Sequence, residues 1–182
     1  MGMIRANKIE ALGREIDSAI RLTFAGEDPV AVHAIAAEAH RIMQDFYRSR
    51  GEVESYLRLG DWIAPEHAAR FWRYFGASAE FLKPGDWDAA TIFELDEDTN
   101  DFMIVFASRW YQKMGAEATR AMRVFATWYV ACNPGILRPD AMPEAQLNEQ
   151  LRAMSIALRS LSRADRLRAG QMALGTVVKP AA

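Results

Sequence analysis

Two of the three histidines, His33 and His40, carry the side chains best suited to metal binding or proton transfer. They are seven residues apart, nearly two helical turns, so both lie on one helix face. Zinc needs further ligands, and the nearest carboxylate, Glu38, is two positions before His40 and points elsewhere. The sequence contains no Glu-x-x-His and no His-Glu-x-x-His pattern. We therefore predict no metal site and interpret both histidines as residues of a helix interface.

Acidic residues are concentrated between positions 94 and 101, where a cation could bind. An EF-hand calcium loop needs glycine at its sixth position and glutamate at its twelfth. Counted from Asp96, those positions hold Asp101 and Ala107, so the pattern does not match. We interpret the carboxylates as favourable charges at the positive end of a helix macrodipole. Magnesium binding by the remaining carboxylates stays an open alternative.

The single cysteine, Cys132, would be a nucleophile only beside a histidine. It follows an apolar helical stretch, residues 125–130, which favours a buried and unreactive thiol. One cysteine allows no internal disulfide and fits a reducing compartment. Gly-x-Ser-x-Gly, Walker and Gly-x-Gly-x-x-Gly motifs are all missing from the sequence. We therefore predict no catalytic residue and no cofactor.

Arg70 and Arg73 alternate with aromatic residues, and Lys83 follows near the end of the same expected helix. Guanidinium groups beside aromatic rings can neutralise and stack on nucleotides, so these three residues are the candidate nucleic-acid-binding side chains. The alternative is that the aromatic rings are core and the arginines are solvated. The formal net charge of −2 gives no overall field that would attract nucleic acid.

Five tryptophans are many for 182 residues and could line a small-molecule pocket, although core packing explains them equally well. They are Trp62, Trp72, Trp87, Trp110 and Trp128.

Hydrophobic spacing predicts an all-α protein, a helical bundle of about five core helices followed by a long C-terminal helix. Asp28 and Pro29 are typical of a helix start, and Gly26 of the end of the helix before it, which predicts an antiparallel hairpin. The expected core helices span residues 9–24, 29–46, 65–82, 98–114 and 118–131.

The longest apolar run, residues 102–107, is far shorter than the roughly 20 residues that a membrane helix needs. The first residues show no apolar signal region, so we expect a cytoplasmic protein without a membrane segment.

The last segment has a different character. After Pro143, apolar residues step by four and three over two heptads, and we call them the heptad seam: Leu147, Leu151, Met154, Leu158 and Leu161. We divide the chain into a bundle domain, 1–138, and a helical extension, 139–182, whose tail after about Gly170 should be loosely ordered. The seam should dock on its own bundle or on a second copy, and a homodimer is the expected assembly.

Charge is distributed unevenly along the chain. Residues 61–120 carry six basic and eleven acidic side chains, whereas residues 121–182 carry eight basic and four acidic ones. We expect the basic surplus of the C-terminal segment to meet the acidic middle third.

Three stretches together resemble an uncharacterised bacterial family of small helical proteins, over roughly residues 8 to 138. They are residues 19–22 with 28–36, residues 80–83, and residues 124–129 ending at Asn133-Pro134. Many family members carry an Asn-Phe-Phe-Lys-His-Ala-like segment, often preceded by arginine. That segment is similar to the arginine–histidine motif of HEPN domains, which are helical bundles that pair as dimers and often cut RNA.

The resemblance implies a HEPN-like bundle, in which the histidine transfers a proton and the arginine holds the phosphate. Here Lys83-Pro84-Gly85 replaces the family's Lys-His-Ala, and Ala79-Glu80 replaces its Arg-Asn. No catalytic residue is therefore carried over.

We expect a non-catalytic interaction or regulatory module of the bacterial cytoplasm, and its expected partner is a second copy or another protein. One alternative is a HEPN-like RNA-binding or ribonuclease-type protein with altered active-site residues. The other is small-molecule binding in a tryptophan-lined pocket.

Overall fold

The computed structural model describes residues 3–52, 63–65, 92, 94–136 and 149–176. Six helices make up this part of the chain: α1 (Lys8–Ala25), α2 (Pro29–Ser49), α5 (Glu97–Lys113), α6 (Arg120–Cys132), α8 (Glu149–Arg159) and α9 (Arg163–Gly175). The predicted all-α class and bundle are confirmed. The predicted helix over 65–82 lies almost entirely outside the described residues. None of the described helices is long and apolar enough to cross a bilayer.

The α1–α2 hairpin forms where local sequence rules place it. Asn7 caps α1 by accepting a hydrogen bond from the Glu10 backbone, and the Glu10 side chain accepts one from the Asn7 backbone. Gly26 ends α1 with φ at 71°, a left-handed conformation that glycine adopts without strain. The Asp28 side chain then accepts from the first backbone amides of α2. The caps predicted at Gly26 and Asp28 are therefore confirmed.

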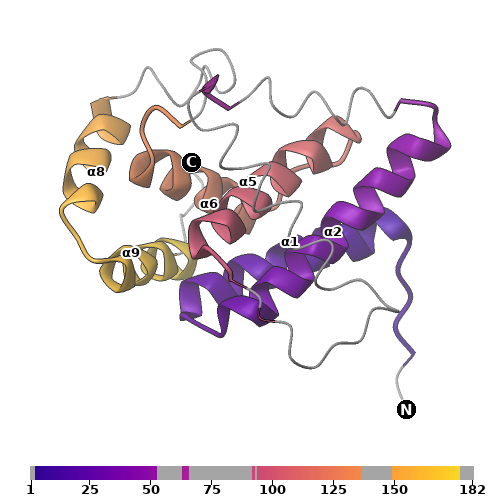
Figure 1. The fold of residues 1–182 in the computed structure, drawn as a ribbon, viewed down its shortest axis with the longest axis horizontal. Helices are drawn as coiled ribbons and strands as arrows, with labels where there is room; N and C mark the ends of the chain where they lie inside the picture. The colour runs from indigo at the N-terminus through magenta and orange to yellow at the C-terminus, as the bar shows by residue number, and fades with distance from the viewer. Residues whose placement is uncertain (1–2, 53–62, 66–91, 93, 137–148, 177–182) are drawn as a thin grey trace, which may run out of the picture.

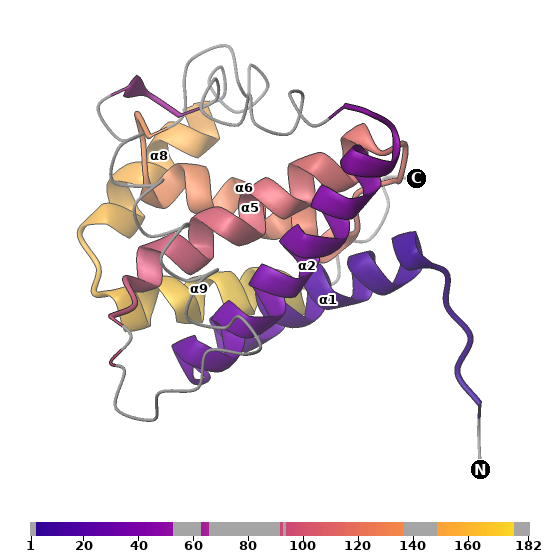
Figure 2. The same cartoon turned by 45° about the vertical axis from the view of Figure 1, so that its right-hand side comes forward.

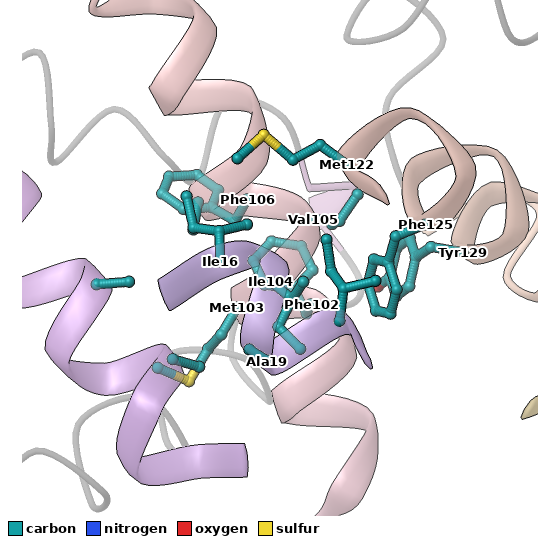
Figure 3. Close-up of a cluster of buried hydrophobic side chains, with 14 of the residues drawn as sticks. Ile16, Ala19, Phe102, Met103, Ile104, Val105, Phe106, Met122, Phe125 and Tyr129 are labelled. Atoms are coloured by element: carbon teal, nitrogen blue, oxygen red, sulfur yellow. The ribbon is translucent and has the colours of Figure 1, made fainter. Parts of the chain in front are cut away.

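Helix α5 is the centre of the bundle. Figure 1 shows it between the α1–α2 hairpin and α6, with α8 beyond α6. All six residues of the apolar run 102–107 are buried, because α5 contacts α1, α2 and α6 at once. Side chains from α1, α5 and α6 interlock in this core, among them Ile16, Phe106 and Phe125 (Figure 3).

The predicted long C-terminal helix is in fact two helices. Helix α8 ends at Arg159, and α9 starts at Arg163 with Ser162 as its N-cap, whose hydroxyl accepts from the backbone of Asp165. Serine followed three residues later by an acidic side chain is a helix-start signal, and it lies where the heptad pattern fails. The chain therefore turns instead of continuing the α8 axis (Figure 2).

Helix α9 also corrects the expectation of a loosely ordered tail after Gly170, because it continues to Gly175. It packs on both α1 and α6. Gly170 is buried against the ring of Phe24, so the α1 surface fixes this part of the chain. Residues 177–182 lie outside the described part.

Candidate binding cavity

A cavity of about 310 Å³ lies at one end of the bundle, where the α1–α2 turn meets the first turns of α5 and α9. Its apolar wall consists of Pro29 and Val32 from α2 with Ala164 and Leu167 from α9. Capping positions these elements, because the starts of α2, α5 and α9 are each fixed by the side chain that precedes the helix. Three helix starts, each held by its own capping side chain, therefore surround the cavity.

Arg163 closes the side of the cavity between α9 and α5. Its guanidinium makes two hydrogen bonds to Asp101, of 2.7 and 3.2 Å, and one of 2.7 Å to Glu97. A longer contact of 3.4 Å reaches Asp98. The Asp101 side chain is 3% exposed, so this is a largely buried, bidentate pair. The expected meeting of the basic C-terminal segment with the acidic middle third is confirmed here.

Burial shifts the pKa values of the two members of this pair in opposite directions. It raises the pKa of Asp101 to about 6, although the hydrogen bonds and charge of Arg163 lower it; Asp98 and Glu97 add to the rise. Burial also lowers the pKa of Arg163, but hydrogen bonds and charges from Asp101 and Glu97 outweigh it and raise that pKa overall. Asp101 thus titrates far closer to neutrality than an ordinary aspartate.

Asn100 joins the start of α5 to the start of α2 beside the cavity. Its side-chain amide donates to the Pro29 carbonyl at 2.8 Å, and its side-chain oxygen lies 2.6 Å from Nδ1 of His33. Because the amide oxygen is an acceptor, His33 carries its proton on Nδ1 and donates a hydrogen bond to Asn100. Burial lowers the pKa of His33 below its usual range, so the imidazole is neutral.

His40 lies deeper in the same α2–α5 interface. Its Nε2 donates to the Met103 carbonyl at 3.0 Å, and the ring stacks on Phe106 at 5.3 Å. Burial lowers the pKa of His40 to about 4. The interpretation of both histidines as interface residues is confirmed. In the described ranges, no group of three His, Cys, Asp or Glu side chains is arranged to hold a metal.

The other reactive side chains are buried in neutral form. Burial raises the pKa of Cys132 to about 11, so the thiol stays protonated and weakly nucleophilic. Burial also raises the pKa of Tyr129 well above its usual value, with Asp101 and Asp98 adding to the rise. The predicted buried thiol is confirmed.

The sequence-based candidates for ligand recognition are only partly within the described structure. Arg70, Arg73 and Lys83, proposed for nucleic acid, lie outside the described residues, as do Trp62, Trp72 and Trp87.

Trp110 and Trp128 are core residues. Trp110 packs edge-on against Tyr47 at 4.6 Å, and Trp128 against Phe24 at 5.2 Å. The indole N–H of Trp128 donates to the Arg166 carbonyl of α9 at 2.8 Å. Neither ring lines the cavity, so core packing is the correct explanation for these two tryptophans.

The heptad seam faces its own chain over most of the described length. Leu158 is buried in the core, and Leu151 and Met154 pack against that core. Leu161 is 41% exposed, and Leu147 lies outside the described residues. Helix α8 contacts α6, so the covered part of the seam docks in cis.

Sequence reasoning did not identify the cavity itself. The sequence marked Asp101 only as one member of an acidic run and Arg163 only as one member of a basic segment. The two residues are 62 positions apart in the chain. The opposite charge of the two chain segments was the available signal, and it does not say which residues pair. Thr23, Glu27 and Leu167, which also line the cavity, carried no signal.

Comparison with known proteins yields no matching family model, no matching curated protein and no matching solved structure. The resemblance to the bacterial family and to HEPN domains therefore remains a hypothesis.

Proposed function

We propose that this protein is a non-catalytic regulatory module that binds a small molecule in the cavity between the α1–α2 turn, α5 and α9. The cavity carries the proposal: about 310 Å³ is near the lower end of the usual size range for small-molecule sites. It combines an apolar wall with polar groups such as Glu97 and Asp101, an arrangement typical of ligand pockets.

A catalytic role has less support among the described residues. Cys132 and Tyr129 hold their protons because of burial, and His40 is neutral and hydrogen-bonded to a backbone carbonyl. A nucleophile would need an adjacent base or a lowered pKa. The pKa values of this thiol and this phenol are shifted upward instead. The geometry favours binding over covalent chemistry.

The regulatory part of the proposal rests on α9. This helix contributes Arg163, Ala164 and Leu167 to the cavity, so a bound molecule would contact it directly. The same helix is fastened to the bundle by the Arg163–Asp101 pair and by the Trp128–Arg166 hydrogen bond. Ligand binding should therefore stabilise the docked position of α9.

Homodimerisation through α8 is the second candidate function. Ile156 is 76% exposed and Leu161 is 41% exposed, which leaves apolar side chains beside the covered part of the heptad seam. Light scattering coupled to size exclusion tests it: the wild type should be a dimer and Ile156→Glu a monomer. A monomeric wild type contradicts it.

For RNA binding, the candidate residues Arg70, Arg73 and Lys83 are outside the described residues, and no described contact favours RNA binding.

We keep the cytoplasm as the proposed location, which the single free Cys132 supports.

Native mass spectrometry of protein purified from its host tests ligand binding. Ala164 is exposed at the cavity wall, so Ala164→Leu should fill the cavity without disturbing the core. Ala173→Leu is the matched control, because Ala173 is an exposed residue of the same helix that does not line the cavity. We expect a small-molecule adduct on the wild type and on Ala173→Leu, and its loss from Ala164→Leu. An adduct of equal abundance on all three proteins, or on none, contradicts the proposal.

A further inference from the structure

We propose that the cavity takes a small organic cation, an alkylammonium or short diammonium compound. This inference rests on the proposed function, because it names the ligand class of the same cavity.

The charge of the cavity lining favours a cation. Glu27, Glu97 and Asp101 contribute carboxylates, and Arg163 is the cation among the described lining residues. The Arg163 guanidinium is already bonded to Asp101 and Glu97. Glu27, on the α1–α2 turn, has no ion-pair partner among the described residues. The lining side chains therefore carry excess negative charge, three carboxylates against one guanidinium. The partial positive charges at the starts of α2, α5 and α9 offset part of it, but the carboxylates of Asp28 and Asp96 already cap two of these ends.

The side chains of the lining offer several free hydrogen-bond acceptors. The Thr23 hydroxyl donates to the Ala19 carbonyl at 2.8 Å, which leaves lone pairs on its oxygen. The exposed carboxylates of Glu27 and Glu97 accept as well. The side-chain amide of Asn100, in contrast, already uses one of its two N–H donors on the Pro29 carbonyl. A ligand that donates several hydrogen bonds, as an ammonium group does, matches this set.

An organic cation fits better than a bare metal ion. In the part of the chain that the structure describes, no three ligating side chains converge on one point, and the guanidinium of Arg163 lies among the carboxylates. The opposite wall is apolar, with Val32 from α2 and Leu167 from α9. Methylene groups bury favourably against such a wall. The cavity thus matches a short chain that is charged at one or both ends.

Thermal shift and isothermal titration calorimetry of the full chain test this assignment at constant ionic strength. The probes are 1,4-diaminobutane and n-butylamine, with 1,4-butanediol, succinate and magnesium chloride as comparison compounds. We expect the two amines to bind and to raise the melting temperature, and the three other compounds to do neither. Binding by only succinate, the diol or magnesium overturns the cation assignment.

Two exposed glutamates give a matched pair of variants. Glu27→Gln removes a lining carboxylate, and Glu117→Gln makes the same charge change on the α5–α6 connection, away from the cavity. We expect amine binding to weaken about tenfold in Glu27→Gln and to stay unchanged in Glu117→Gln, since losing one charge-assisted hydrogen bond corresponds to roughly that factor. Equal weakening in both variants shows general charge attraction and overturns the assignment.

The cation inference and the proposed function fail in different ways. If succinate or the diol binds, and Ala164→Leu abolishes that binding, the cavity is a ligand site for another chemical class. If no probe binds while the native adduct persists on the wild type, the cation class is wrong and the binding function stands. If the amines bind equally to Ala164→Leu, they bind outside the cavity and the inference is overturned.

Discussion

Replacing Gly170 by alanine tests how α9 is held on α1. A Cβ atom at this position would lie 2.2 Å from Cε1 of Phe24 and 2.6 Å from Cδ1 and Cζ of the same ring. The ring has little room to move, because it is 2% exposed and packs against Phe125 at 5.3 Å and Trp128 at 5.2 Å. The extra methyl group must therefore displace either the core ring or α9.

The expected magnitude follows from two opposing effects. Overpacking a core typically costs about 1–3 kcal/mol, whereas replacing glycine by alanine inside a helix gains about 1 kcal/mol. Because the new Cβ would lie 2.2 Å from a buried ring, the overpacking cost belongs at the upper end of that range. We therefore expect a net loss of about 2 kcal/mol in the free energy of unfolding. For a chain of this size, each kcal/mol lowers the melting temperature by about 2–4 °C. Gly170→Ala should thus melt several degrees below the wild type.

Gly175→Ala is the matched control, because it lies in the same helix and a Cβ there would meet nothing within 4 Å. Calorimetry and urea unfolding should show no loss of stability for this variant. Limited trypsin digestion should cut faster after Arg166 and Arg168 in Gly170→Ala, since undocking exposes α9. If Gly170→Ala is as stable as Gly175→Ala and equally resistant to trypsin, the packing of α9 on Phe24 is wrong.

Four further predictions concern titration and packing. Carboxyl NMR should place the pKa of Asp101 near 6, and Arg163→Gln should raise this pKa further because the guanidinium lowers it. A midpoint near the ordinary 3.8 would show that burial does not outweigh the charge of Arg163. Since the folded pKa is the higher one, Asp101 contributes stability that is lost as pH rises from about 4 through 6. In urea unfolding, the free energy of unfolding of Asp101→Asn relative to that of the wild type should therefore be higher at pH 7.5 than at pH 4.5. A difference between the two proteins that is the same at both pH values would refute this. Cys132 should react with a disulfide reagent at pH 8 only as fast as the protein unfolds, because its buried thiol has a pKa of about 11. Gly13→Ala should cost less than Gly170→Ala in thermal melts, since its Cβ meets the hydroxyl end of Tyr111 at 2.8 Å and that side chain can shift.

Local sequence rules predicted the α1–α2 hairpin because each signal acts within one helical turn. Asp28 caps the amides of the next residues, and Gly26 adopts a left-handed conformation at its own position. The α8–α9 break was missed although its signal was also local. Ser162 and Asp165 form a helix start, but the heptad spacing of leucines before them favoured one continuous helix. Two local patterns competed there, and the cap determined the structure.

The cavity could not be predicted from local patterns. Asp101 and Arg163 meet only because α9 folds back across α1, which depends on Gly170 fitting against Phe24. Charge imbalance indicated that the two segments attract each other, but exposed pairs alone do not determine a position. Burial of Asp101 in the bundle, which makes the pair specific, is a property of the three-dimensional packing.

Hydrogen–deuterium exchange tests whether a ligand in the cavity stabilises α9, because it locates both the ligand and the response of α9 in one experiment. Protein purified from its host would be compared with the same protein stripped of small molecules by unfolding and refolding. We expect slower exchange with ligand at the α1–α2 turn around Glu27, at the start of α5, and along α9 from Ala164 to Gly170. Unchanged exchange in these three segments, with protection elsewhere or nowhere, would contradict a ligand-binding cavity that controls α9.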